Sequence, residues 1–218
     1  MSNVTIPESM QLTPFLKHFE QTASADCGAM TSASVLRQVD ADFVSCLEQL
    51  GGKTFRHGLY RVFRGDQIED ATSAIQRVFP EYRENIVAFG YDWLGRHFAI
   101  DKRRMEGGRP LVLMLEVGTG QAMQIPVPIM EFHNTELVEY ADDALAQKFF
   151  QQWRAVHSDP IDSDHCVGYK IPLFLGGSDT LDNLELIDLS VYVEICGQLR
   201  NKIKTLPAGQ TIKDVVIA

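Results

Sequence analysis

The sequence predicts an α+β fold in which an antiparallel β-meander packs against N- and C-terminal helices. Helical patterns lie at 33–50 and 66–79 before the middle of the chain, and at 142–157 and 189–206 after it. The middle, 86–127, carries short apolar runs separated by glycine turns. Because helices flank a block of strands and do not alternate with them, these observations favour α+β over a parallel α/β sheet.

The two N-terminal helices are predicted from apolar residues that recur every three or four positions. The stripe of the first helix is Val35, Val39, Phe43, Cys46 and Leu50, and the pair Gly51-Gly52 ends it. The stripe of the second is Ile68, Ala71, Ile75 and Phe79, with Pro80 just beyond. A short strand is expected between them at 58–63.

Four strands are expected next, at 86–89, 96–101, 111–117 and 121–127. Their separators have the composition of tight turns, notably Glu106-Gly107-Gly108 and Gly118-Thr119-Gly120. Since such short connections join antiparallel neighbours, the last three strands should form one meander. The apolar run from Leu111 to Leu115 lacks alternation, which indicates a central strand covered on both faces.

The chain then returns to helix. The segment 142–157 follows an Asp-Asp start that suits a helix N-terminus and places Leu145, Phe149 and Trp153 four apart, with Phe150 and Val156 alongside. A strand is expected at 167–175. The last helix has the stripe Leu189, Tyr192, Cys196, Leu199, Ile203 and Leu206. We expect Trp153 and this stripe to pack on the sheet.

Composition limits the class of protein. The 218 residues suit one domain or two small ones, and 45% hydrophobic with 22% charged residues is ordinary for a soluble protein. The chain shows neither the roughly 20-residue apolar run of a membrane span nor a signal-peptide pattern at its start, so a cytoplasmic protein without a membrane partner is expected. The cysteines form no CxxC pair, so free buried thiols are expected and no cofactor or metal: Cys27, Cys46, Cys166 and Cys196.

The net charge of −9 is concentrated in one region. Residues 129–195 hold 13 acidic side chains and three basic ones, whereas residues 1–128 have a balance of only −2. Such a region repels nucleic acid and accelerates encounter with a basic partner. The alternative is that these charges only keep the protein soluble.

An enzymatic alternative starts at Cys27. Gln21 precedes Asp26-Cys27-Gly28 in a segment that resembles the nucleophile region of bacteriocin-processing double-glycine peptidases, which belong to the papain-like thiol hydrolases. There the cysteine opens a helix that lowers its pKa, and the glutamine helps to hold the oxyanion. The histidine and carboxylate partners are the weak point, because His97 and Asp101 are closer in sequence than that family places them. A buried, non-catalytic Cys27 is therefore expected.

Other arrangements do not reach the pattern that their chemistry needs. The histidines show no HxH or HxxxH spacing. His165 and Cys166 are adjacent on an expected strand and should point to opposite faces. The turn at Gly118 lacks the lysine of a phosphate loop. The aspartates from Asp159 to Asp164 lack the glycine and glutamate of a calcium loop.

Two groups of residues remain as candidate sites. The first is a possible pocket formed by Asp92, Trp93, Arg96 and His97, for which the alternative is structural, with Trp93 in the core and Asp92 and Arg96 bracing a turn. The second is a partner-binding surface, for which the alternative is a solvated face: Glu131, Glu136, Glu139, Asp142 and Asp143. No catalytic residue is assigned.

Four ordered segments resemble the C-terminal domain of immunity proteins of bacterial type VI secretion systems: Gly90–Asp101, Cys166–Gly177, Asn183–Leu186 and Cys196–Leu199. The resemblance covers about 85–200. Gly52–Val62 also resembles the upstream, GAD-like part of that family and the broader SUKH immunity proteins. This implies an N-terminal part at 1–84, an immunity-like domain at 85–206 and a tail at 207–218.

The resemblance implies a non-enzymatic protein that binds and neutralises a cognate toxin, since some members of the family block a secreted DNase effector. We therefore expect a basic toxin, most plausibly a nuclease, as the partner. A cysteine hydrolase using Cys27 and a small-ligand-binding or regulatory domain stay open as alternatives. The resemblance identifies neither the toxin nor the oligomeric state.

Overall fold

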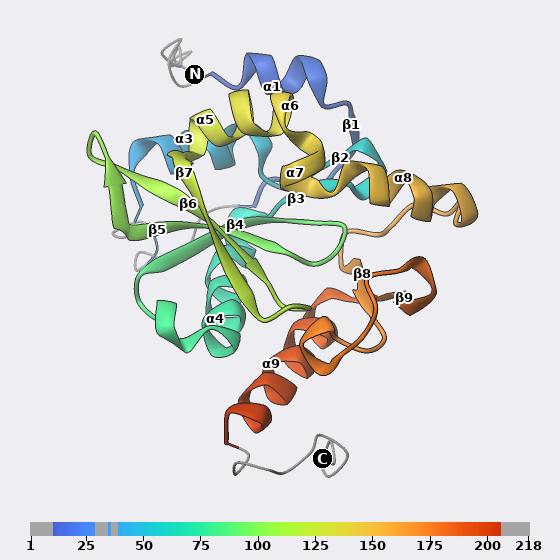
Figure 1. Ribbon diagram of the computed structural model, residues 1–218. Coiled ribbons are helices and arrows are strands. Elements are labelled where there is room, and N and C mark those ends of the chain that lie inside the picture. The colour runs from blue at the N-terminus through green and yellow to red at the C-terminus, as the bar shows by residue number, and fades with distance from the viewer. Residues whose placement is uncertain (1–10, 29–34, 36–38, 206–218) are drawn as a thin grey trace.

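The structure, a computed structural model, describes residues 11–28, 35 and 39–205. Its centre is a seven-stranded antiparallel sheet with helices on both faces (Figure 1). In the view of Figure 1, α1, α3 and α5 to α8 lie above the strands, while α4 and α9 lie below them. The expected α+β class is confirmed.

The sheet is one continuous meander whose strands pair in sequence order. Every neighbouring pair is antiparallel, so the meander expected for the strands at 96–127 is confirmed. The strands are β1 (Gln21–Ser24), β2 (Lys53–Phe55), β3 (Tyr60–Val62), β4 (Ile86–Asp92), β5 (His97–Glu106), β6 (Arg109–Glu116) and β7 (Gln121–Pro128). Because β3 pairs with β4, the expected domain boundary after residue 84 divides a continuous sheet.

The helices surround this sheet, and a second, two-stranded sheet follows them. The helices are α1 (Thr13–His18), α3 (Ala41–Leu50), α4 (Ile68–Val78), α5 (Ile129–Glu131), the π-helical turn η5 (Phe132–Glu136), α6 (Leu137–Glu139), α7 (Ala141–Leu145), α8 (Gln147–Val156) and α9 (Leu189–Thr205). The 3-10 turns within the described part of the chain are η2 (Arg56–Gly58), η3 (Gly65–Gln67), η4 (Pro80–Tyr82), η6 (Leu173–Leu175) and η7 (Leu181–Asn183). The small sheet pairs β8 (His165–Tyr169) with β9 (Leu184–Asp188).

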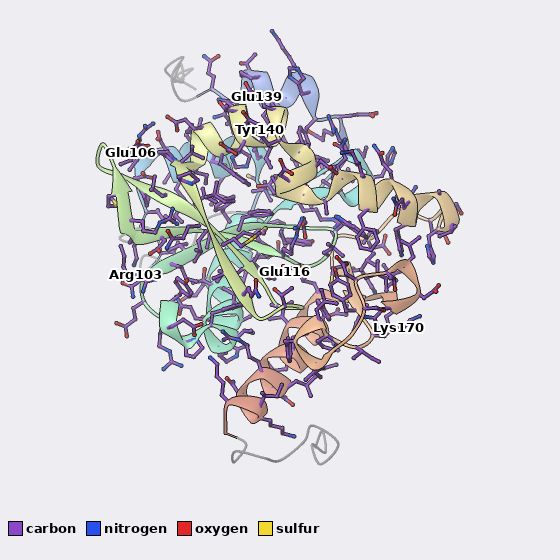
Figure 2. The ribbon with its side chains drawn as sticks, viewed as in Figure 1. Arg103, Glu106, Glu116, Glu139, Tyr140 and Lys170 are labelled. Carbon is purple, nitrogen blue, oxygen red and sulfur yellow. The ribbon has the colours of Figure 1, made fainter. Side chains whose placement is uncertain are left out.

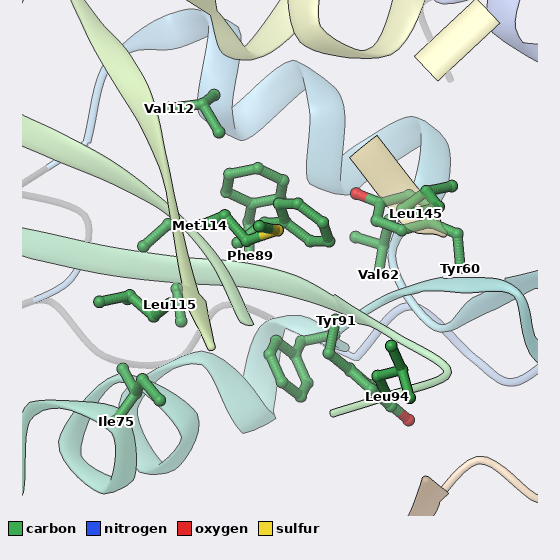
Figure 3. Close-up of a cluster of buried hydrophobic side chains, with 14 of the residues drawn as sticks. Tyr60, Val62, Ile75, Phe89, Tyr91, Leu94, Val112, Met114, Leu115 and Leu145 are labelled. Carbon is green, nitrogen blue, oxygen red and sulfur yellow. The ribbon is translucent and has the colours of Figure 1, made fainter. Parts of the chain in front are cut away.

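The core forms on both faces of β4, whose seven residues are all buried. Phe89 of β4 packs with Phe43, Phe98 and Phe132, with ring centroids 5.8–6.4 Å apart. On the side of α4, Ile75 points toward the strands in the close-up of this cluster (Figure 3). Burial on both faces explains why this part of the chain lacks the alternation of a half-exposed strand.

Helix α4 is also held to β4 by hydrogen bonds. The register of β4 against β5 shifts between Ala88 and Gly90, which disrupts the ladder there. The Thr72 hydroxyl accepts a hydrogen bond from the Ala88 N–H at 3.0 Å, and Gln76 donates to the Ile86 carbonyl at 3.2 Å. Polar residues of a mostly apolar helix face thus satisfy backbone groups beside the bulge.

Two expected helices are shorter than the apolar pattern suggested. The helix expected at 33–50 is wrong as a single element, because Val39 and Asp40 are not helical and α3 begins at Ala41. The Asp40 side chain caps it by accepting from the Phe43 N–H at 3.0 Å. Part of 33–38 lies outside the described residues.

The helix expected at 142–157 is interrupted at Ala146, whose left-handed backbone (φ 49°, ψ 47°) separates α7 from α8. The break turns α8 so that Phe150 and Trp153 are buried, whereas Val156 is 68% exposed. Val156 was therefore misplaced on the buried face. Trp153 packs on Trp93 in the turn between β4 and β5, with ring centroids 6.3 Å apart.

The C-terminal segment differs from expectation in two ways. The strand expected at 167–175 ends at Tyr169, and its partner β9 was missed. The last helix packs mainly on α4 and on the small sheet, and not on the seven-stranded sheet as expected. Gly197 of α9 allows the close approach to α4, because a Cβ there would lie 3.0 Å from a Val78 methyl.

The break at Ala146 gives a test by mutation. A non-glycine residue in the left-handed region costs roughly 1–2 kcal/mol, so Ala146→Gly should stabilise the protein by about 1 kcal/mol. The matched change Ala155→Gly, on the exposed side of α8, should destabilise it by about 1 kcal/mol. Urea unfolding monitored by circular dichroism measures both. Destabilisation by both glycines would show that Ala146 is not strained.

Two buried histidines give a test by pH. Burial lowers the pKa of His97 and of His133 from 6.5 to about 4, so both are neutral in the fold. Because the folded pKa lies below the unfolded one, their stabilisation is complete above about pH 6.5 and is lost as the pH falls toward 4.

Each histidine should therefore reduce the free energy of unfolding by about 1.4 kcal/mol per pH unit within that window. Urea titrations at several pH values between 5 and 7.5 give the slope. In His133→Gln the slope should be smaller by about one histidine's contribution. An unchanged slope in this variant would contradict the assignment of His133 as a neutral buried base.

Candidate functional site

The turn between β4 and β5 is a buried ion pair wrapped by its own backbone. One carboxylate oxygen of Asp92, Oδ1, accepts the N–H groups of Leu94 and Arg96, both at 3.0 Å. The other, Oδ2, accepts Arg96 Nε at 2.6 Å. Asp92 is fully buried and Arg96 nearly so. Burial raises the pKa of Asp92, and the Arg96 guanidinium opposes that rise.

This turn also binds helix α7. Trp93 Nε1 donates to the Leu145 carbonyl at 2.9 Å, and Arg96 Nη2 donates to the Ala144 carbonyl at 3.2 Å. Both carbonyls lie in the last turn of α7, where the helix itself offers no donor. The Trp93 carbonyl in turn accepts the Val167 N–H of β8 at 2.6 Å. The turn thus joins β4, α7 and β8.

The four residues expected to form a pocket therefore separate into two roles. Asp92, Trp93 and Arg96 form a buried brace, which is the structural alternative that the sequence left open. His97 lies on the other side of the turn and lines a cavity of about 420 Å³ between α4 and the start of α9. Its Nδ1 lies 2.9 Å from the Gly95 carbonyl.

The acidic group at 131–143 is brought partly together. Glu136 and Asp143 line a groove of about 250 Å³ between the α5–α7 segment and the edge strand β7. The same groove contains Tyr140 and Met123, which are 49% and 45% exposed. Glu139 lies next to Tyr140 on α6, at the top of the view in Figure 2. An apolar groove with carboxylates on its rim suits a basic, partly apolar partner.

The other two acidic candidates are neutralised within the chain. Glu131 accepts from Arg109 at 2.7 Å, and Arg109 also lies 3.9 Å from Asp42. Asp142 pairs with Lys148 at 2.7 Å and accepts the Lys148 backbone N–H at 2.8 Å, so it stabilises the first turn of α8. These two carboxylates therefore pair within the chain, and neither lines the groove.

The acidic side chains of residues 129–195 lie on several elements. One part lies on α5–α7, and another lies on and around the small sheet, including Asp182, Glu185 and Asp188. In Figure 2, Glu139 on the first part is labelled at the top of the view, and Lys170, beside the second, at the lower right. The acidic residues of this segment therefore come from separate elements of the fold.

The histidine and the carboxylate of the enzymatic alternative lie apart. Cys27 is exposed and not buried as expected, in the loop after β1, where its carbonyl accepts the Gly65 N–H. His97 and Asp101 lie four positions apart on β5, which separates their Cα atoms by roughly 13 Å. Asp101 instead bonds Arg103, at 3.2 Å. The other three thiols are buried: Cys46, Cys166 and Cys196.

Cysteine and histidine do meet once in the core. Cys46 Sγ lies 3.9 Å from His133 Nδ1, but burial raises the pKa of this thiol far above its usual range. Within residues 11–28, 35 and 39–205, no three His, Cys, Asp or Glu side chains cluster in a way that could hold a metal ion. Over the same residues, no helix has the length and apolar character needed to cross a bilayer.

The sequence reasoning missed the apolar half of the groove. Met123 and Tyr140 lie 17 positions apart, and only the folding of the α5–α7 segment against β7 brings them together. The available indication was the edge position of β7, whose Pro126 and Pro128 cannot donate to a strand ladder.

The brace itself can be tested by removing its charge. Asp92→Asn should destabilise the protein by about 3 kcal/mol or more, because it leaves the Arg96 guanidinium buried without its counter-ion. Asp66→Asn serves as the control, since Asp66 and Arg64 form an exposed pair and its loss should change stability little. Chemical unfolding measures both. Equal, small effects would show that the turn does not depend on the ion pair.

Comparison with known proteins agrees with this architecture. Residues 130–200 match the family described as T6SS immunity protein Tdi1, C-terminal. The crystal structure of Atu4351 from Agrobacterium tumefaciens is similar with a TM-score of 0.61 and 14% identity, over 86% of this chain and 89% of that chain, which shows a shared fold. No curated protein matches the sequence.

The family match is shorter than the resemblance expected from the sequence, which began near residue 85. It leaves out the turn from Gly90 to Asp101 and includes α5 to α9 together with the small sheet. Over residues 130–200, the chain is similar to the C-terminal domain of type VI secretion system immunity proteins, as the sequence led us to expect.

Proposed function

We propose that this protein is an immunity protein that binds and neutralises a cognate toxin of a type VI secretion system. The match of residues 130–200 to the immunity family carries the proposal. The groove supports it, because Phe132, Glu136, Tyr140 and Asp143 all lie inside that matched segment.

The chemistry of the groove supports a basic partner. Most of its lining residues are apolar or aromatic, and exposed aromatic and methionine side chains are frequent anchors of protein interfaces. The carboxylates of Glu136 and Asp143 on its walls favour lysine or arginine on the bound surface. A nuclease is a toxin of this kind, since its substrate groove must attract phosphate.

The placement of the acidic residues bears on how the toxin would be bound. A mimic of nucleic acid would present a continuous acidic face, whereas in the groove Glu136 and Asp143 share a surface with the exposed side chains of Met123 and Tyr140. We therefore propose that the toxin is bound through a short basic and apolar segment seated in the groove between β7 and α5–α7.

The direct test is co-expression with the product of the neighbouring reading frame. Expression of that product alone should arrest bacterial growth, and this chain should restore growth and form a complex that survives size-exclusion chromatography. Failure of the chain to protect cells from any product encoded beside it would contradict the proposal.

The groove is tested by reversing its charges. Glu136→Lys combined with Asp143→Lys should weaken toxin binding by at least tenfold, chiefly through slower association, and should leave thermal stability nearly unchanged. Wild-type association should also slow as salt is raised, because charges beyond about 8 Å are screened at physiological ionic strength.

The matched control for this pair is Glu185→Lys, which reverses an exposed charge on β9, away from the groove. Surface plasmon resonance compares the association rates of the three proteins. An equal loss in the control would show that regional charge, and not the groove, determines binding.

A further inference from the structure

The cavity beside His97 lies on the side of the sheet that carries α4 and α9, and none of its lining residues borders the groove. Its walls come from three distant parts of the chain: Phe63 follows β3, Ala71 and Ala74 belong to α4, and Leu189 and Val193 belong to α9. A volume of about 420 Å³ is within the range of small-molecule sites.

The hydrogen bond of His97 fixes which of its nitrogens can accept. A carbonyl oxygen only accepts, so His97 Nδ1, 2.9 Å from the Gly95 carbonyl, must carry the proton. In the neutral ring Nε2 is then an acceptor. No described residue bonds Nε2, although the side chain is only 2% exposed and lines the cavity.

His133 shows what a satisfied core histidine looks like in the same protein. Its Nδ1 bonds the Ile129 carbonyl at 2.7 Å, and its Nε2 bonds the Tyr60 hydroxyl at 2.9 Å. Both ring nitrogens are therefore used. In His97, only Nδ1 has a partner among the described residues, and Nε2 is not one of the fully buried side-chain atoms that lack a partner, so a donor in the cavity can reach it.

The surroundings of His97 indicate the shape of a molecule that fits the cavity. The Phe63 ring lies 5.6 Å from the imidazole and is stacked on Tyr91 at 4.9 Å, which holds a flat aromatic wall in place. The remaining walls are small aliphatic side chains and serine hydroxyls of α4 and α9. The charged side chains of Asp70 and Arg77 also line the cavity, and Arg77 Nη2 lies 3.8 Å from Glu194 Oε2.

We propose that this cavity binds a small, uncharged, planar molecule whose N–H or O–H group donates a hydrogen bond to His97 Nε2. The ligand would stack near Phe63 and contact both α4 and α9. This site uses no residue of the groove, so it is independent of the proposed toxin binding.

Indole is a suitable probe, because it is flat, uncharged and has a single N–H donor. Titration of the isotope-labelled full chain with indole, followed by NMR, should give saturable shifts at Phe63, His97 and Val193. The ¹⁵N resonance of His97 Nε2 should move as this nitrogen accepts the bond. The analogue 1-methylindole has the same ring without the donor and should bind about fivefold to tenfold more weakly.

Variants separate the hydrogen bond from the shape of the cavity. His97→Phe should weaken indole about fivefold to tenfold and leave 1-methylindole unaffected, because the ring is kept and only the acceptor is lost. Ala74→Leu fills the cavity from α4, keeps the His97 acceptor and should abolish binding of both compounds. Met123→Ala, in the groove, is the control and should bind both as the wild type does.

Three results would overturn the proposal: no saturable shift at the cavity up to the solubility limit of indole, equal affinity for the two compounds, or unchanged binding in Ala74→Leu. If His97→Phe does not fold, the comparison of the two compounds on the wild type and on Ala74→Leu decides the matter. Protection against a toxin is measured separately, so failure here leaves the proposed function intact.

Discussion

The buried ion pair of Asp92 and Arg96 is the interaction on which the rest of the fold depends. A charge pair taken out of water is stable only when its remaining donors and acceptors are satisfied, and here the backbone of the turn and the end of α7 supply those partners. Gly95 completes the turn with φ +73°, and a Cβ there would lie 3.0 Å from Cys166 Sγ. The turn therefore links the sheet to the segment that matches the immunity family.

That link explains two irregular features of the matched segment. The helix breaks at Ala146 because the preceding carbonyls of α7 are bound by Trp93 and Arg96, which turns α8 across the sheet. The π-helical turn from Phe132 to Glu136 leaves Phe132 buried against β4 and β5 and places Glu136 at the groove. Local departures from regular helix are thus what position the candidate binding surface.

The groove is lined by residues of α6 and α7 and the His97 cavity by residues of α4 and α9, and these helices lie on opposite sides of the sheet (Figure 1). Each site is formed partly by the matched segment. The groove uses α5 to α7, and the cavity uses the start of α9. Both are completed by parts of the chain before residue 130, namely β7 for the groove and α4 for the cavity. The segment that defines the family therefore depends on the sheet to form either site.

The sequence by itself determined the α+β class, the meander from β5 to β7 and the helices α4 and α9, because hydrophobic periodicity and turn composition are local properties. It could not show that Ala146 would break a helix or that β8 would pair with β9, since both depend on contacts between distant residues. The same reason applies to the sites. The sequence shows where the acidic residues are, but packing decides that Glu136 shares a groove with Met123 and that Asp142 pairs with Lys148. The sequence placed His97 in one group with Asp92. The tertiary structure gives the two residues different roles, because the cavity beside His97 is formed by elements that are distant in the sequence.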